Sequence, residues 1–417
     1  MSSVLLIATL DTKSEEASYV KARIESHGEK VILANTGVFL SLAGKTDIMG
    51  KEDIRGEEIV KAGCALSIDE LKAKKDKGYS IKSITKGIKI ITKRLYSEGK
   101  IAAVLSIGGA QGTDIGTAAM RELPFGVPKF MVSTVASGKA AFGPFTGTKD
   151  IIMMHSVCDI QGLNIVTRSV FDNAASAVCG MVKARRQSLG RSGAGRAGSI
   201  AVSMLGTTTP GALYAKELIE KENYDFVAFH QNGTGGIAME EMIEEGLFKG
   251  VLDINLHEIG DRYFGGLHGS VREGRLESAA RTGLPQVIAP GSINYTVQGP
   301  YAEVSDELKK RQHIIHNSFL TLVRLTPDEL TEVGKITAQK INLSKGKVHV
   351  YIPLRGFSFP DSIEREHWDP EGNAAFIGAL KKNLRKDVPY NELDMHINDS
   401  EFIDIAVNKL FSFIKGK

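Results

Sequence analysis

The stretch IAAVLSIGGAQGT, residues 101–113, decides the fold class. It begins with a nearly continuous apolar run, 101–107, and ends in a glycine-rich polar turn, 108–113. A short apolar run of this kind is typical of a parallel strand that helices cover on both faces. A glycine turn that leads into a helix is typical of the strand–turn–helix unit of α/β proteins.

The same order of elements recurs along the chain. Apolar runs at 4–9, 200–205 and 225–229 each lead through a polar or glycine-rich turn into a helical pattern. Strands that alternate with helices through short turns predict parallel sheets with right-handed crossovers. We therefore expect an α/β protein with two doubly wound, Rossmann-like subdomains and mostly parallel sheets.

A polar, basic stretch rich in glycine and serine separates the two halves. Residues 186–198 read RQSLGRSGAGRAG and show no apolar periodicity, which is typical of a solvated linker. We therefore predict an N-terminal nucleotide-binding subdomain at 1–185, a linker at 186–198 and a C-terminal subdomain at 199–417. A chain of 417 residues is long enough for two or three domains.

Composition indicates an ordinary soluble protein. The chain has 52 Lys and Arg against 49 Asp and Glu, a net charge of +3, which offers no electrostatic reason to expect nucleic-acid binding. Its three cysteines are too few for a disulfide framework and indicate a reducing compartment. The short apolar run at 4–9 predicts a buried strand rather than a signal peptide, and no run is long enough to span a bilayer. We expect a cytoplasmic protein that binds neither nucleic acid nor membranes.

Four loops of the first half follow predicted strands, where open α/β sheets bind their ligands. The glycine turn at 108–113 can bring backbone N–H groups and a helix N-terminus to a phosphate, or it can be a tight packing turn. Asp159 could hold Mg²⁺ or a ribose hydroxyl, or cap the helix after it. The other two loops could bind ribose and phosphate, or be a helix cap and a surface loop. The residues selected from the three phosphate and ribose loops are Asp11, Thr12, Lys13, Gly108, Gly109, Gln111, Gly112, Thr113, Thr134, Ser137 and Gly138.

The second half carries two further ligand-type loops and a group of histidines. The first loop offers Thr207 and Thr208, and the second offers Gly233, Thr234, Gly235 and Gly236. A polar pocket with an acid–base histidine and an arginine clamp would suit a small anionic substrate. A pair of neutral histidines with a carboxylate could instead hold a transition metal, although the HExxH spacing of a zinc site is absent from the sequence. Structural histidines are the third alternative. The candidate catalytic residues are His230, Glu240, His257, Glu258 and Arg272.

Taken together, these motifs resemble a family of uncharacterised bacterial and archaeal proteins, UPF0261, which shares a Tm-1-like ATP-binding domain with a plant protein of tomato mosaic virus resistance. The resemblance covers about residues 3–415. The motifs that carry it are Ala8–Lys13, Gly108–Thr113, Met131–Gly138, Asp159 with Gly162–Asn164, Gly206–Pro210, Gly233–Glu240, Arg311 with His316–Asn317, and His396–Asp399.

The resemblance implies two Rossmann-like subdomains, ATP with Mg²⁺ in the first of them, and a homodimer. It also implies that the additional TIM-barrel-like domain of the plant protein has no counterpart here, and the antiviral role belongs to the plant member. The chain departs from the family pattern at 230–233 and at 255–258. ATP binding therefore transfers from the family more directly than any chemistry in the second subdomain.

Three functions remain open from the sequence. The first is phosphoryl or nucleotidyl transfer from ATP to a small molecule in the cleft between the subdomains, a reaction that depends mainly on positioning and charge neutralisation. The second is a non-catalytic nucleotide-binding module that regulates or recruits a partner. The third is an enzyme that acts on a small anionic metabolite at the histidine and arginine cluster.

Overall fold

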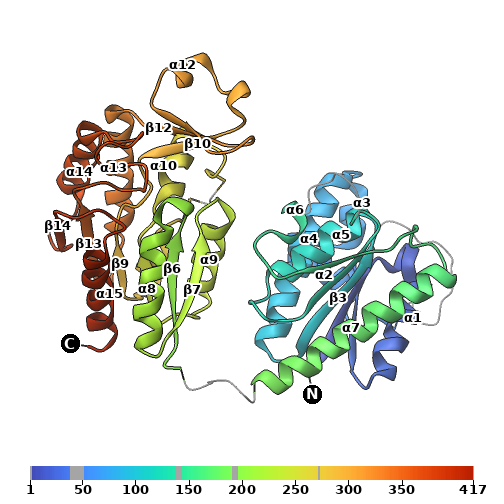
Figure 1. Cartoon of the computed structure of the whole chain (residues 1–417). Helices are drawn as coiled ribbons and strands as arrows, with labels where there is room; N and C mark the ends of the chain where they lie inside the picture. The colour runs from blue at the N-terminus through green and yellow to red at the C-terminus, as the bar shows by residue number, and fades with distance from the viewer. Residues whose placement is uncertain (1, 38–50, 137–142, 190–195, 271–272, 417) are drawn as a thin grey trace. The chain divides into compact units, whose positions relative to one another are not determined.

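The computed structural model of the chain describes residues 2–37, 51–136, 143–189, 196–270 and 273–416 (Figure 1). The chain divides into two compact units, unit 1 (Met1–Ser192) and unit 2 (Gly193–Lys417). Helix α7 (Ile165–Leu189) reaches into the predicted linker at 186–198, so the first part of that stretch is helical. In the last turns of this helix, the guanidinium of Arg186 pairs with both carboxylate oxygens of Glu29, at 2.7 and 2.8 Å.

Unit 1 is a five-stranded parallel sheet between two layers of helices. The strand order is β2-β1-β3-β4-β5. Its elements besides α7 are β1 (Ser3–Ala8), α1 (Leu10–Ser26), β2 (Val31–Asn35), α2 (Gly56–Cys64), α3 (Ile68–Ala73), α4 (Lys77–Ser97), β3 (Ile101–Gly108), α5 (Ala110–Arg121), β4 (Lys129–Ser133), α6 (Gly143–Thr146) and β5 (Ile152–His155).

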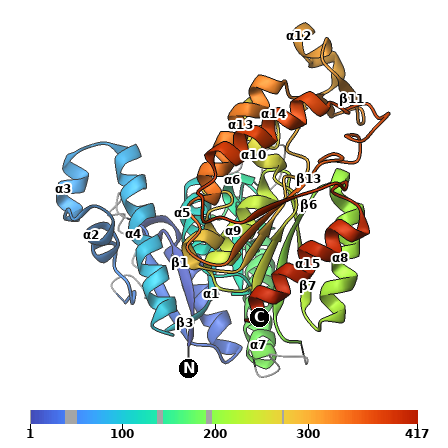
Figure 2. The ribbon, with the colours of Figure 1, turned by 90° about the vertical axis from the view of Figure 1, so that its left-hand side faces the viewer.

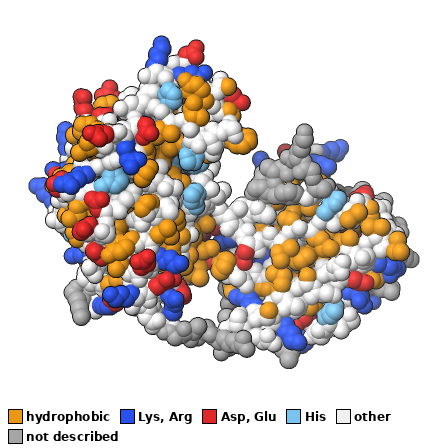
Figure 3. Space-filling model, viewed as in Figure 1, with side chains coloured by type: hydrophobic (Ala, Val, Ile, Leu, Met, Phe, Trp, Pro, Cys, Tyr) orange, Lys and Arg blue, Asp and Glu red, His pale blue; other side chains and the backbone are white. Residues whose placement is uncertain are grey.

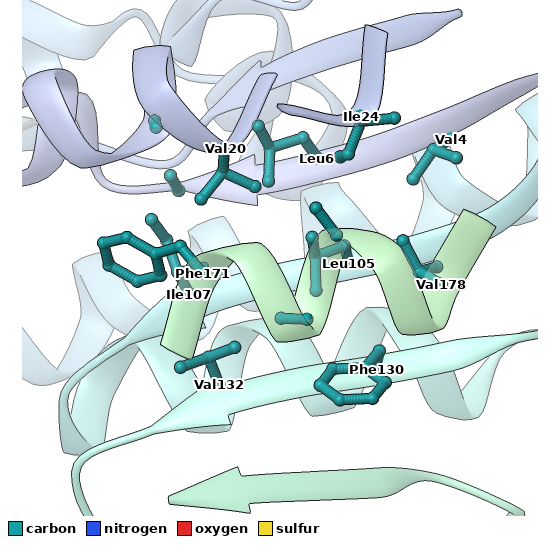
Figure 4. Close-up of a cluster of buried hydrophobic side chains, with 14 of the residues drawn as sticks. Val4, Leu6, Val20, Ile24, Leu105, Ile107, Phe130, Val132, Phe171 and Val178 are labelled. Carbon is teal, nitrogen blue, oxygen red and sulfur yellow. The ribbon is translucent and has the colours of Figure 1, made fainter. Parts of the chain in front are cut away.

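Strand β1 is buried along its whole length because its alternate side chains enter two different cores. Val4 and Leu6 pack with α1 and α7, whereas Leu5 and Ile7 pack with α2, α4 and α5. Figure 4 shows the first of these cores, where α7 lies over Leu105 of β3. The continuous apolar runs in the sequence therefore reflect strands with helices on both faces.

Unit 2 contains a six-stranded parallel sheet in the order β14-β13-β9-β8-β6-β7. The elements of this sheet and its helices are β6 (Ser199–Met204), α8 (Thr209–Lys221), β7 (Asp225–His230), α9 (Thr234–Glu244), β8 (Gly250–Asp253), α10 (His257–Phe264), α11 (Ser278–Thr282), β9 (Gln286–Ile288), α13 (Pro327–Ile341), β13 (Val348–Pro353), α14 (Pro370–Asn383), β14 (Tyr390–Leu393) and α15 (Ser400–Ile414).

Helices cover both faces of this second sheet (Figure 2). Helices α8 and α15 form a core with one face, and α10, α13 and α14 form a core with the other. A small antiparallel sheet in the order β10-β12-β11 is added to this unit, with α12 nearby in sequence. Its elements are β10 (Tyr295–Gln298), α12 (Asp306–Lys309), β11 (His313–Ile315) and β12 (Thr321–Arg324).

The prediction of an α/β protein with two doubly wound, mostly parallel sheets is confirmed. The antiparallel sheet was not predicted, because its strands are only three or four residues long and carry no regular alternation. In the described part of the chain, every helix is too short or too polar to cross a bilayer. Acidic and basic side chains are interspersed on the face drawn in Figure 3.

Candidate functional site

Unit 1 has a cavity of about 790 Å³ at the carboxyl edge of its sheet. It lies where β1 and β3 are neighbours and where the helices that follow them, α1 and α5, pack on opposite faces. Such a reversal of winding is where open α/β sheets bind ligands. The lining residues are Thr9, Asp11, Thr12, Lys13, Leu71, Lys72, Lys75, Asp76, Lys77, Ser80 and Gly108–Gly112.

The first wall of the cavity is the turn after β1. Lys13 has φ −132° and ψ 26°, which interrupts α1 and separates a short turn, 10–12, from the regular helix. The N–H of Leu10 donates to Oδ1 of Asn35 at 3.1 Å, which ties this turn to the end of β2. Asp11, Thr12 and Lys13 therefore line the cavity from a turn that is fixed by the neighbouring strand.

The second wall is the glycine turn after β3. A Cβ on Gly108 would lie 2.8 Å from the Cα of Gly112, so this crossing requires glycine. Gly109 is the N-cap of α5 and has no side chain to accept from the first-turn N–H groups. The Thr113 hydroxyl bonds the carbonyl of Gly109 at 2.8 Å and the Ser133 hydroxyl at 2.7 Å. These bonds tie the turn to α5 and β4, and a helix N-terminus that has no side-chain cap among the described residues faces the cavity.

The third wall comes from α3 and the start of α4. It adds Lys72, Lys75 and Lys77, together with the carboxylate of Asp76. Lys75 has φ +51°, and the Asp76 side chain caps α4 by accepting from the N–H of Tyr79 at 2.9 Å. With Lys13, the cavity has four lysines against two aspartates, so its lining carries a net positive charge.

Unit 2 reverses its winding at the equivalent place, between β6 and β8, but there the side chains bond to one another. The Thr207 hydroxyl bonds the hydroxyls of Ser292 at 2.6 Å and Tyr295 at 2.9 Å. The side-chain amide of Asn255 donates to Thr208 and Ser292, both at 2.9 Å. These hydroxyls hold the loops of unit 2 together.

A buried arginine organises the glycine turn of unit 2. Arg275 is 1% exposed and donates to both carboxylate oxygens of Asp253 at 2.7 Å. It also pairs with Glu240 and with Glu258, each at 3.2 Å. Burial alone would lower the pKa of Arg275, but the three carboxylates outweigh burial and raise it. Burial raises the pKa of Glu258, although Arg275 opposes that effect.

A second buried cluster lies at the start of α10. His257 and Asp261 are fully buried, and their nearest ligand atoms and one from His268 all lie within 4.8 Å of one another. The His257 and His268 rings meet edge to face, with their centroids 5.2 Å apart. Burial lowers the pKa of His257 to about 4 and also lowers the pKa of His268, although Asp261 opposes both shifts. Both imidazoles are therefore neutral near pH 7.

Two family models together match nearly the whole chain. The model described as the N-terminal domain of an uncharacterised protein family, UPF0261, matches residues 2–187, and the model of the C-terminal domain of that family matches residues 198–414. The chain belongs to the UPF0261 family.

Full-length relatives agree with this assignment. A UPF0261 protein of Clostridium tetani is 38% identical over 99% of both chains, and one of Rhizobium meliloti is 34% identical over 98% of both. The ToMV resistance protein Tm-1(GCR237) of Solanum lycopersicum is 32% identical over 80% of this chain and 44% of the plant protein. The predicted resemblance to this family and to the tomato protein is confirmed.

The UPF0261 chain brings most of the predicted nucleotide-binding residues to one cavity. Seven of the eleven line it, namely Asp11, Thr12, Lys13, Gly108, Gly109, Gln111 and Gly112. Thr113 is buried behind the turn, and Thr134 is near Gly109 but outside the lining. Ser137 and Gly138 lie outside the described residues. Asp159, the predicted Mg²⁺ ligand, is exposed and belongs to no described group of three or more metal-binding side chains.

The predicted catalytic residues of unit 2 divide between the two buried clusters. Glu240 and Glu258 belong to the Arg275 network, where Glu240 also accepts from the N–H of Ser278 at 2.8 Å. His257 belongs to the second cluster, and His230 is exposed at the end of β7. Arg272 lies outside the described residues.

The glycine turn of unit 2 is already engaged within the fold. The N–H groups of Gly233 and Gly236 donate to the same Glu258 oxygen at 2.6 and 3.1 Å. The other two predicted ligand-loop residues, Thr234 and Gly235, both bond the side-chain oxygen of Asn232. The contacts of this loop are thus internal to unit 2.

Sequence reasoning missed the lysine wall and the position of Arg275. A signal for the first was present, because residues 72–80 read KAKKDKGYS, a lysine-rich run with an N-cap aspartate before a helix. Arg275 meets side-chain partners that lie 17 to 44 residues away in sequence, so no local pattern marks that network.

Proposed function

We propose that unit 1 of this UPF0261 protein binds ATP in the cavity between the turns after β1 and β3. The observation that carries this proposal is the combination, in one cavity, of an uncapped helix N-terminus and four lysines. Backbone N–H groups at a helix N-terminus bind phosphate, and lysines neutralise its charge. A volume of about 790 Å³ is within the range of sites for ligands of nucleotide size.

The carboxylates that could accompany nucleotide-bound Mg²⁺ are those in the cavity lining. Asp11 and Asp76 are there, whereas the exposed Asp159 is not. Carboxylates and phosphate oxygens are the ligands that Mg²⁺ prefers. We therefore expect Mg²⁺ to strengthen ATP binding through Asp11 or Asp76.

Calorimetric titration of the full chain with ATP, with and without Mg²⁺, tests the proposal. We expect Lys13→Ala and Lys72→Ala each to weaken ATP binding about 10- to 100-fold, since a charge-assisted hydrogen bond contributes roughly 1.5–3 kcal/mol. Binding of AMP should change less, because the lysines would contact the outer phosphates. Lys93→Ala on the exposed side of α4 is the matched control and should leave the affinity unchanged.

Gly112→Ala tests the glycine turn without disturbing the fold. Of the atoms in the described residues, only the carbonyl oxygen of Ile107 would lie within 4 Å of a Cβ at Gly112, at 3.6 Å, which is an ordinary contact. Alanine also favours a helix over glycine by about 1 kcal/mol. We therefore expect Gly112→Ala to be stable and to bind ATP more weakly. Gly180→Ala in α7 is the control and should bind ATP as wild type does.

The proposal fails if wild-type protein gives neither heat nor thermal stabilisation with ATP. Saturation at a hundred times Kd should stabilise the protein by about 2.7 kcal/mol. It also fails if the lysine and glycine variants bind as tightly as wild type. Phosphate release, measured in the same samples with and without small-molecule acceptors, separates phosphoryl transfer from binding alone.

A further inference from the structure

Three side chains of unit 2 converge on a point that neither the nucleotide cavity nor the Arg275 network uses. His257 opens α10, Asp261 follows one turn later, and His268 lies in the loop after the helix. The i, i+4 spacing places His257 and Asp261 on the same face of α10. One ligand atom from each of the three side chains lies within 4.8 Å of the other two.

The two imidazoles each have a buried nitrogen without a hydrogen-bond partner among the described residues. Nδ1 of His257 lies 3.1 Å from the backbone carbonyl of Ser292 and donates to it, so Nε2 carries the lone pair. That Nε2 atom is buried and unpartnered, as is Nδ1 of His268. A buried polar atom without a partner costs roughly 1–3 kcal/mol, so two such nitrogens at one place within the described residues point to a ligand.

Asp261 is oriented by groups that leave it able to bind a cation. Oδ1 accepts from the Thr296 hydroxyl at 2.6 Å and from the N–H of Val297 at 2.7 Å. Oδ2 accepts from the backbone N–H of His268 at 2.6 Å and keeps a second lone pair. Hydrogen bonds of this kind, including the one from His257 to a carbonyl, are typical of the groups that orient metal ligands.

A glycine-rich loop brings His268 back over α10. Gly265 ends the helix with φ +80°, a conformation that favours glycine. A Cβ on Gly266 would lie 2.0 Å from Oδ1 of Asp261, and one on Gly269 would lie 2.8 Å from the Cα of Arg262. The loop can approach α10 this closely only with glycine at both positions.

We propose that His257, Asp261 and His268 bind a divalent transition-metal ion such as Zn²⁺ or Fe²⁺. Two imidazoles with one carboxylate suit these ions, whereas Mg²⁺ and Ca²⁺ prefer oxygen ligands. Three protein ligands leave at least one coordination position for water or substrate, which is the arrangement of catalytic rather than structural sites. The proposal is independent of ATP binding in unit 1.

His230 is a histidine of unit 2 that could act beside such an ion. Its charge would lower the pKa of both His257 and His268, so it lies within electrostatic reach of the two rings. It is exposed at the end of β7 and was selected from the sequence as an acid–base residue. His230 would then contact a substrate rather than complete the coordination.

Metal content of the full chain tests the proposal directly. Protein stripped with a chelator is reconstituted with Zn²⁺ or Co²⁺, desalted and measured by elemental analysis, and the Co²⁺ form is examined for visible d–d absorption. We expect one tightly held ion per chain. Asp261→Asn and His268→Gln should each weaken Zn²⁺ binding by about tenfold or more, since loss of even an outer-sphere partner costs 10–100-fold.

The matched control is His316→Gln, which removes an exposed histidine of the same unit and should bind Zn²⁺ as wild type does. Far-ultraviolet circular dichroism and the emission of Trp368, the single tryptophan, verify that each variant is folded. If Asp261→Asn does not fold, the Zn²⁺ content of wild type is compared with that of His268→Gln, whose substitution lies in the loop after α10. Failure of wild-type protein to retain Zn²⁺ or Co²⁺, or equal binding by the variants, overturns the proposal.

Discussion

Replacement of Arg275 by glutamine should destabilise unit 2 more than any surface change. The guanidinium pairs with the carboxylates of Asp253, Glu240 and Glu258. It donates a hydrogen bond of 2.7 Å to each oxygen of the Asp253 carboxylate. Glutamine is shorter and neutral, so it leaves Asp253 buried without its counter-charge. The other two carboxylates keep backbone N–H partners, which limits their share of the loss.

The expected magnitude follows from burial. All four side chains are no more than 2% exposed, so water cannot replace the lost partner. Removal of one member of a buried ion pair costs about 3–5 kcal/mol. Because domains of this size are stable by only about 5–15 kcal/mol, the variant should lose a large part of the unfolding free energy of unit 2.

Urea unfolding followed by Trp368 emission measures this loss, because the single tryptophan belongs to unit 2. Arg281→Gln is the matched control. Arg281 is 45% exposed and pairs at the surface with Glu277, so its loss should cost no more than about 1 kcal/mol. The two variants remove the same charge from the same unit and differ mainly in burial.

The loss should also depend on pH in a defined direction. Burial raises the folded-state pKa of Glu258, and Arg275 works against that rise. A carboxyl group with a raised folded pKa favours folding when it is protonated, and this contribution is lost as pH rises through the folded pKa. Without Arg275 the folded-state pKa of Glu258 should rise further. The loss of unfolding free energy relative to wild type should therefore be larger at pH 8 than at pH 5. A loss below about 1 kcal/mol, or one equal at both pH values, would refute the reasoning.

Two further predictions concern unit 1. Gly87→Ala should destabilise it by about 1–3 kcal/mol or more, because a Cβ there would lie 1.9 Å from a backbone carbonyl of α2 where α4 crosses it. Differential scanning calorimetry checks this against Gly180→Ala, which meets nothing within 4 Å and should be neutral or stabilising. Burial raises the pKa of the Cys179 thiol to about 11, so at pH 8 iodoacetamide should modify the half-buried Cys64 and Cys158 well before Cys179. Mass spectrometry of alkylated peptides would show equal rates if this reasoning were wrong.

The parallel sheets were predictable because their signal is local. A strand such as β3 is covered on both faces, so nearly every residue is apolar and the run stands out in the sequence. The end of α7 was not predictable in the same way. Residues 186–189 look like linker in sequence, but they are helical in the structure. The partner of Arg186 there, Glu29, lies 157 residues away, so no local pattern marks the contact.

The candidate sites were predictable to the extent that they follow strands. The turns at 11–13 and 108–112 were selected because each follows an apolar run. In the structure these runs are the neighbouring strands β1 and β3, so both turns line one cavity. The lysine wall comes from α3 and α4, which lie between β2 and β3 in sequence, and no local rule places it over that edge. The i, i+4 pair of His257 and Asp261 was visible in the sequence, but the return of His268 depends on how closely its glycine loop approaches α10.

The two sheets share a winding order. Their glycine turns are nevertheless chemically different, and this difference predicts the stoichiometry of ATP binding. In unit 1 the N-cap Gly109 leaves the first-turn N–H groups of α5 facing a cavity. In unit 2 the N–H groups of Gly233 and Gly236 already donate to Glu258, and a Cβ on Gly236 would lie 1.7 Å from that carboxylate. A phosphate could enter there only by displacing a buried carboxylate that also pairs with Arg275. Titration should therefore saturate at one ATP per chain, and a second site of similar affinity would mean that the Glu258 network opens in solution.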